Sequence, residues 1–262
     1  MNKVWAISDI HLPGTTRKTM EKYGDIWKNH PAIILENVKK LCDKNDILLI
    51  PGDISWAPNL DRAKKDLEYL GSFPCHIILC SGNHDRWAAT LPRDELVKVL
   101  PSNITWIHDV CFRIGNLAIV GSCFWEFRNV FPWPDHVGII ENLAKHQKEE
   151  LKRFEKALKL VPDDANLIKI LMLHVPPIPY DASPYTFSTQ ISEKNIDYCV
   201  FGHAHNVVEK VPACDAIIKG THYFLCSADF LKMTPIHICD FDNDSQPYII
   251  DEKGKITPLN IL

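Results

Sequence analysis

The sequence lacks the cysteine pattern of a disulfide framework or a zinc finger. Nine cysteines are present in 262 residues, but no two of them form a C-x-x-C pair. They are dispersed along a long chain, and most lie within or beside apolar runs, where a free cysteine behaves as a small buried hydrophobe. We therefore expect reduced thiols in the core.

The sequence also lacks a long apolar stretch. No run approaches the roughly 20 residues that span a bilayer. The first residues, Met1–Ile7, lead directly into a polar motif and leave no room for a signal peptide. These observations predict a cytoplasmic protein without a transmembrane segment, and they leave peripheral contact with a membrane open.

A surplus of basic residues is missing as well. Lysine and arginine number 29 against 33 aspartates and glutamates, so the formal net charge is -4. This balance argues against a dedicated nucleic-acid binder and favours a small substrate. Repeats, low-complexity tracts and linkers are absent from a chain that is 46% hydrophobic. We expect one domain over residues 1–262; the oligomeric state stays undetermined.

Short apolar runs rich in isoleucine, leucine and valine are the main structural signal. They predict strands buried on both faces at Val4–Ser8, Ile47–Pro51, His76–Cys80, Leu117–Gly121, Ile168–Leu173 and Tyr198–Phe201. Helical patterns lie between or after them, at Ala32–Cys42, Asp61–Leu70, Arg93–Leu100 and Ile140–Leu160. Alternating strands and helices indicate a layered α/β fold.

The pattern changes near the end of the chain. Three further runs, Tyr223–Ser227, Pro235–Asp240 and Tyr248–Asp251, follow one another without a helix between them. This predicts an antiparallel addition, and with it a second sheet packed on the first.

Polar residues follow the apolar runs in five blocks. The blocks are Asp9-Ile10-His11, Gly52-Asp53, Gly82-Asn83-His84-Asp85, His174 and Gly202-His203-Ala204-His205. Carboxylate, imidazole and amide side chains are ligands for Mn, Fe(II), Zn and Mg ions. If the chain stays extended, Asp9 and His11 point to the same side, as do His203 and His205. The blocks therefore predict a site for two divalent metal ions.

The five blocks, in this order, resemble the calcineurin-like metallophosphoesterase superfamily, whose pattern is D-x-H, G-D, G-N-H-[DE], a lone H and G-H-x-H. The resemblance extends from Asp9 to His205, about three quarters of the chain. It implies an α/β/β/α sandwich of two mixed sheets flanked by helices. It also implies two divalent metal ions, Mn, Fe or Zn, whose identity the ligand set does not decide.

The resemblance implies a role for each matched residue. One ion would be held by Asp9, His11 and His205, the other by Asn83, His174 and His203, with Asp53 bridging the two ions. His84 is similar to the family's catalytic histidine, which gives a proton to the leaving oxygen or stabilises the phosphoryl oxygens. Asp85 would orient that imidazole and support it electrostatically.

Substrate contacts are expected from the segments between the blocks. Arg86 and Arg17 are candidates for gripping a phosphoryl oxygen. The aromatic segments near 123–136 and 176–189 are candidates for a cap, and within them Trp125, Arg128 and Tyr185 are candidates for substrate binding. Their aromatic side chains would stack a base or hold an acyl chain, or else pack the cap against the domain.

These expectations favour a phosphohydrolase for a phosphomonoester or small phosphodiester, in which a metal-bridging hydroxide attacks phosphorus and His84 acts as general acid. Two alternatives remain. The first is a lipid-linked pyrophosphatase of the UDP-diacylglucosamine type, if the aromatic segment holds acyl chains. The second is a non-catalytic metal-binding scaffold, which would not need the pair His84 and Asp85.

Overall fold

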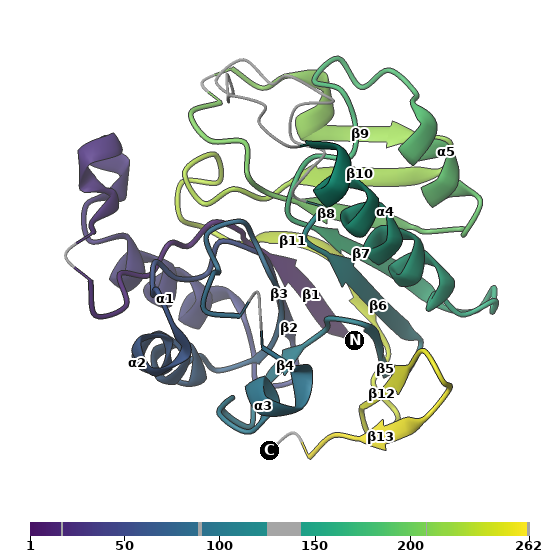
Figure 1. The fold of residues 1–262 in the computed structure, drawn as a ribbon, viewed down its shortest axis with the longest axis horizontal. Coiled ribbons are helices and arrows are strands. Elements are labelled where there is room, and N and C mark those ends of the chain that lie inside the picture. The colour runs from purple at the N-terminus through teal and green to yellow at the C-terminus, as the bar shows by residue number, and fades with distance from the viewer. Residues whose placement is uncertain (17, 89–90, 125–142, 208, 261–262) are drawn as a thin grey trace.

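The computed structural model describes residues 1–16, 18–88, 91–124, 143–207 and 209–260. Two β-sheets lie face to face, with helices on their outer sides (Figure 1). The predicted α/β/β/α sandwich of two mixed sheets is therefore confirmed.

The first sheet has the strand order β11-β1-β2-β3-β4. Its central strands are parallel, and β11 pairs with β1 in the antiparallel sense. The strands are β1 (Asn2–Ala6), β2 (Ile47–Pro51), β3 (His76–Cys80), β4 (Ile104–Trp106) and β11 (Ile236–Phe241).

The second sheet has the order β13-β12-β5-β6-β7-β8-β10-β9. Strands β6, β7, β8 and β10 are parallel, and antiparallel strands complete both edges. The strands are β5 (Val110–Ile114), β6 (Leu117–Ser122), β7 (Ile168–Leu173), β8 (Tyr198–Phe201), β9 (Asp215–Ile218), β10 (Thr221–Leu225), β12 (Tyr248–Asp251) and β13 (Ile256–Pro258).

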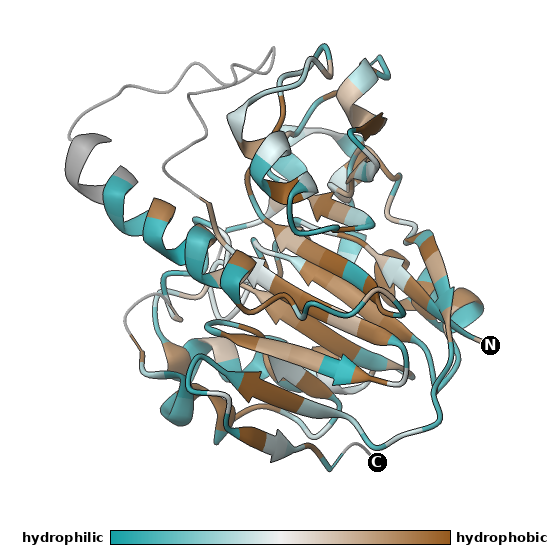
Figure 2. Cartoon of the chain, turned by 90° about the vertical axis from the view of Figure 1, so that its right-hand side faces the viewer, coloured by the Kyte–Doolittle hydropathy of each residue, from teal (hydrophilic) through white to brown (hydrophobic). Residues whose placement is uncertain are grey.

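The helices join these strands and cover the two outer faces. They are α1 (His30–Leu41), α2 (Leu60–Gly71), α3 (Arg93–Val97), α4 (Leu143–Lys159) and α5 (Thr186–Ser192). Short 3-10 turns lie at Met20–Tyr23, Asp25–Trp27 and Pro212–Cys214. Figure 2 shows α4 largely hydrophilic along its length, beside strands that are hydrophobic.

Alternation along each strand divides the apolar side chains between three cores. In β2, Ile47 and Leu49 face the core between the sheets, whereas Leu48 and Ile50 face the core under α1 and α2. In β7, Leu171 packs into the third core, under α4 and α5. Successive side chains of a strand point to opposite faces. A run that is apolar at every position therefore belongs to a strand covered on both sides, as the sequence predicts.

The three C-terminal runs do not form one antiparallel addition, and this expectation was wrong. Strand β10 is parallel to β8 in the second sheet, β11 pairs with β1 in the first, and β12 pairs with β5 in the second. Each run pairs with the edge strand of a sheet that earlier strands have formed. Local periodicity does not specify which edge strand that is. Strands β4, β5, β9 and β13 were not predicted.

All nine cysteines are buried and unbridged, as expected. Within the described ranges, no helix is both long enough and apolar enough to cross a membrane.

Candidate metal centre

The predicted ligands lie where parallel strands of the two sheets end. Asp9 and His11 follow β1, Asp53 follows β2 and Asn83 follows β3; His174 follows β7, and His203 and His205 follow β8. Backbone hydrogen bonds join these loops to one another, including Asp9 N to Gly52 O (3.1 Å) and Gly202 N to His174 O (2.9 Å). The fold thus brings residues separated by almost 200 positions to one edge.

Asp9, His11 and His205 form the first cluster. Their ligand atoms all lie within 4.8 Å of one another. The Nε2 atoms of His11 and His205 are 3.2 Å apart, and His205 Nε2 is 3.4 Å from Asp9 Oδ1. Nitrogen and oxygen atoms therefore converge on one point.

Asp53, His174 and His203 form the second cluster, again with ligand atoms within 4.8 Å of one another. The amide oxygen of Asn83 joins them, 2.8 Å from His174 Nε2. The other ring nitrogen of His174 is 3.0 Å from the carbonyl oxygen of Pro51. That contact fixes the ring and turns Nε2 toward Asn83 and Asp53.

Asp53 contacts both clusters. Its Oδ1 is 3.5 Å from His174 Nε2, and its Oδ2 is 3.7 Å from His11 Nε2. Its side chain is 2% exposed, so solvent competes little for either oxygen. One buried carboxylate thus presents one oxygen to each set of imidazoles.

The ligand residues leave the strands on turns rather than on extended chain. Asp9, His11, Asp53 and His203 have φ values of 57°, 41°, 51° and 67°, a left-handed region that costs non-glycine residues energy. The expectation that alternation on an extended chain aligns each pair was therefore wrong. Asp9 and His11 still meet, but His203 and His205 contribute to different clusters. Strained backbone of this kind concentrates at functional sites.

Two glycines give the loops room to approach. A Cβ atom on Gly202 would lie 2.1 Å from Ser8 Oγ and 2.3 Å from Asp9 Oδ2. Gly52 has φ +95°, and its Cβ would lie 2.5 Å from His174 Nδ1. Any side chain at either position would displace a ligand residue.

The buried charges in the clusters depend on one another. Burial alone would raise the pKa of Asp9, but His205 and His174 hold that pKa below its usual value. Burial lowers the pKa of His11 to about 3, against the opposing effect of Asp53. Burial also lowers the pKa of His205, but Asp9 and Asp229 outweigh burial and raise that pKa well above its ordinary value.

Asp229 was missed by the sequence analysis. Its Oδ1 is 3.0 Å from His205 Nδ1, and its Oδ2 accepts a hydrogen bond from the backbone of Asn206. A carboxylate on the far nitrogen of a metal-binding histidine fixes the ring and raises its basicity. Ser227 similarly donates to Asp9 Oδ2 (3.0 Å). Both residues follow β10 and belong to no motif, so no sequence pattern points to them.

His84 lies beside the clusters without belonging to either. Its Nε2 is 3.9 Å from Asp53 Oδ2, and 37% of its side chain is exposed. Its ring is 4.2 Å from the ring of Trp56, which stacks at 4.8 Å on His11. Burial lowers the pKa of His84, while Asp53 and Asp9 oppose that shift. The position leaves His84 accessible to a bound molecule.

Asp85 lies in a different environment from the one expected. Its Oδ1 accepts hydrogen bonds from Ile54 N, Ser55 N and the Trp87 indole, and its Oδ2 accepts one from Gly82 N. In the described ranges no hydrogen bond joins Asp85 to His84. Burial raises the pKa of Asp85 to about 7. The carboxylate therefore holds together the loops that carry Asp53 and Asn83.

The other predicted contacts divide into three groups. Arg86 is exposed beside Asn83 and lines a pocket there. Tyr185 caps the first turn of α5 and lies near Phe187, which is buried in the core under α4 and α5. Arg17, Trp125 and Arg128 lie outside the described residues, as does most of the aromatic segment 123–136.

The donor set fits two divalent ions. In the first cluster two imidazole nitrogens lie 3.2 Å apart beside a carboxylate. In the second cluster two imidazoles lie beside a carboxylate and an amide oxygen. Mixed nitrogen and oxygen donors suit ions such as Mn, Fe and Zn. We therefore take the two clusters as a candidate dinuclear metal centre.

The match to a known family agrees with this chemistry. The sequence model of the calcineurin-like phosphoesterase family matches residues 2–207. No curated protein matches. One similar solved structure is a protein of unknown function from Aquifex aeolicus, with 16% identity and a TM-score of 0.47 over 90% of this chain and 96% of that one.

A second similar structure is a purple acid phosphatase from yellow lupin (Lupinus luteus) seeds. It has 14% identity and a TM-score of 0.47, over 95% of this chain and 48% of that one. The family match covers most of the sequence, including all seven predicted ligands. The chain therefore belongs to the calcineurin-like phosphoesterase family.

Proposed function

We propose that the protein is a dinuclear metal-dependent phosphohydrolase that acts on a phosphomonoester or a small phosphodiester. The observation that carries this proposal is the position of Asp53. One carboxylate reaches imidazoles of both clusters, with its two oxygens 3.5 and 3.7 Å from them. This arrangement suits a pair of ions that share a ligand.

The ions, when bound, would lower the pKa of a water molecule and neutralise charge on the phosphoryl group. Asp9, His11 and His205 would hold one ion, and Asn83, His174 and His203 the other, with Asp53 between them. Asp229 and the Pro51 carbonyl keep His205 and His174 turned inward. Burial lowers the pKa of His84, and the negative charges of Asp53 and Asp9 oppose that shift.

His84 supplies the proton or hydrogen bond that the leaving oxygen needs. It is the histidine next to Asp53 that neither cluster uses, and its side chain is partly open to solvent. Trp56 restricts the His84 ring from one side. A positioned general acid contributes typically about 10²–10⁴-fold to a rate.

The two alternatives have less support. A non-catalytic scaffold would not require an accessible histidine held beside the bridging carboxylate. A lipid-linked pyrophosphatase would need an apolar channel for acyl chains. Phe124, from the aromatic segment, is instead fully buried against Phe154 and Phe187.

The proposal is tested with the Mn-loaded protein and two chromogenic substrates, p-nitrophenyl phosphate and bis-p-nitrophenyl phosphate. His84→Ala should lower kcat by about 10²–10⁴-fold and leave the metal content at two ions per chain, measured by mass spectrometry. The exposed His237, which lies by Asp240, provides the matched control His237→Ala.

Complete inactivity of the wild type with every divalent ion would refute the enzymatic function. Loss of metal in His84→Ala would instead show that His84 is a ligand.

A further inference from the structure

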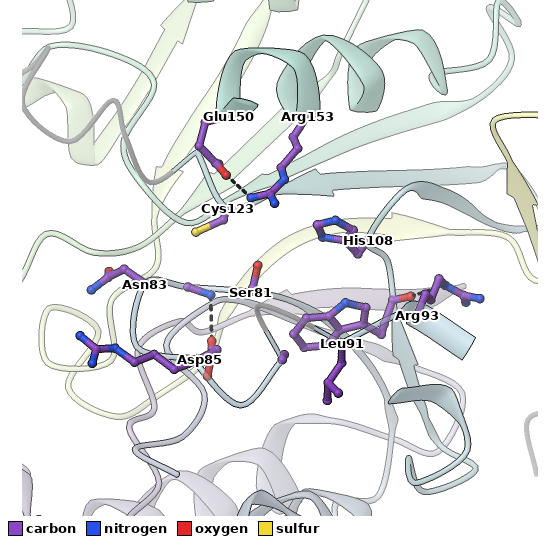
Figure 3. A pocket seen from close by; sticks show the side chains of 13 residues that line it. Ser81, Asn83, Asp85, Leu91, Arg93, His108, Cys123, Glu150 and Arg153 are labelled. Carbon is purple, nitrogen blue, oxygen red and sulfur yellow. Dashed lines mark hydrogen bonds and ion pairs between the residues drawn. The ribbon is translucent and has the colours of Figure 1, made fainter. Parts of the chain in front are cut away.

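A small pocket opens beside the metal centre, on the side of Asn83. It has a volume of about 170 Å³ and lies between the loop after β3 and helix α4 (Figure 3). Asn83 lines the pocket and also contacts His174 in the second cluster. Asn83 is therefore shared by the pocket lining and the second cluster, which places the two next to each other.

Three arginines line the pocket, one from each of three chain segments. They are Arg86, Arg93 and Arg153. In the described part of the chain, neither Arg86 nor Arg93 forms an ion pair; Arg153 pairs with Glu150. Burial lowers the pKa of Arg93, whose Nε donates to the carbonyl oxygen of Trp106 (3.4 Å). The lining also holds two carboxylates, Glu150 and Asp85, so its arginines outnumber its carboxylates by one, and this balance favours a bound anion.

Glu150 adds an unmet hydrogen-bond acceptor. It extends from α4 toward the pocket together with Arg153 (Figure 3), and it is 5% exposed. Its Oε1 accepts from Arg153, but its Oε2 is buried and has no hydrogen-bond partner among the described residues. A buried acceptor without a donor is unfavourable. A hydroxyl group of a ligand would supply that donor.

The size of the pocket limits what enters it. Sites for whole drug-sized ligands have volumes of roughly 300–1,000 Å³, and this pocket is smaller. It therefore fits one part of a molecule, with the remainder at the metal centre.

We propose that this pocket binds the leaving group of the substrate, and that this group carries a hydroxyl and a second anionic group, a carboxylate or a phosphate. The inference rests on the proposed phosphohydrolase function. In the reaction, water forms a new bond to phosphorus as the ester P–O bond breaks. The leaving oxygen takes a proton, and the products are inorganic phosphate and a hydroxylated anion. Arg86, Arg93 and Arg153 bind the second anion, and Glu150 accepts from the hydroxyl.

Two matched substrate pairs test the proposal and distinguish the two anions. Glycerol 3-phosphate and 3-phosphoglycerate differ by a carboxylate, and fructose 6-phosphate and fructose 1,6-bisphosphate differ by a phosphate. With Mn-loaded wild type, kcat/KM from phosphate release should be at least about tenfold higher for the more anionic member of one pair.

Arg153→Gln should lower that preference about tenfold, and Arg153→Lys should restore part of it. The control is Lys152→Gln, which removes the same charge from the neighbouring position of α4, in a different groove. Arg93→Gln is the second test. It leaves the ion pair between Arg153 and Glu150 intact, so it tests the pocket even if Arg153→Gln fails to fold.

Equal kcat/KM within both pairs, or a preference unchanged in both arginine variants, would overturn the inference while the proposed function stands. A wild type that hydrolyses neither these substrates nor either chromogenic substrate, p-nitrophenyl phosphate or bis-p-nitrophenyl phosphate, would refute both; activity on the diester alone would overturn only the inference.

Discussion

Replacing Asp85 by asparagine should destabilise the fold more than it alters the chemistry of His84. Asp85 is fully buried and accepts four hydrogen bonds of 2.8–3.0 Å from three backbone N–H groups and one indole. Three of them reach Oδ1, which asparagine retains. The fourth is donated by Gly82 N to Oδ2. Asparagine has an amide NH2 group at that position, so its N–H would face the Gly82 N–H.

The expected loss follows from these contacts. A buried donor left unsatisfied costs about 1–3 kcal/mol, and an ordinary hydrogen bond contributes about 0.5–1.5 kcal/mol. We therefore expect Asp85→Asn to lower the free energy of unfolding by about 2–4 kcal/mol, or the Tm by roughly 5–15 °C for a chain of this size. Asp85→Ala leaves all four donors unpaired, and their summed cost approaches the typical stability of a domain, about 5–15 kcal/mol.

The assay is urea unfolding followed by circular dichroism, on the metal-loaded protein. Asp163→Asn is the control, because Asp163 is exposed. Metal content and the pH profile of kcat are measured in parallel. An Asp85→Asn variant with wild-type stability and a shifted acid limb of kcat would refute this reasoning and support direct action of Asp85 on His84.

Two further predictions concern the sheets and the loops. His76 begins β3 with its Nε2 2.9 Å from Thr105 Oγ1, and burial lowers its pKa to about 3. The unfolded chain, with a histidine pKa near 6.5, then binds a proton that the folded chain does not, so stability falls as the pH falls from about 6.5 toward 3, by up to about 1.4 kcal/mol per pH unit. His76→Phe should reduce the slope of unfolding free energy against pH by about one proton, and an unchanged slope would contradict this. Gly202→Ala should lower the affinity of the first cluster for Mn, measured by calorimetry, because its Cβ would meet Asp9 Oδ2. Gly254→Ala strains a turn at φ +75° but meets nothing within 4 Å of its Cβ, so it should keep that affinity; equal affinities in both variants would contradict the packing argument.

The sequence by itself predicted the strands that carry the ligands. Continuous apolar runs such as Ile47–Pro51 and His76–Cys80 coincide with β2 and β3, because a strand covered on both faces needs apolar side chains in both directions. The order of the polar blocks then indicated the family, and the family match agrees.

Only the tertiary structure decided how those residues are used. The resemblance already assigned His203 and His205 to different ions, but the structure shows that left-handed turns at Asp9 and His203, rather than strand alternation, direct the side chains there. Asp229 contacts the His205 ring from 24 positions along the chain. Asp85 accepts hydrogen bonds from the loops that follow β2 and β3. The arginine-lined pocket needs α4 and the loop after β3 side by side. Periodicity reports which face of an element is covered, whereas these contacts depend on which distant segments pack together.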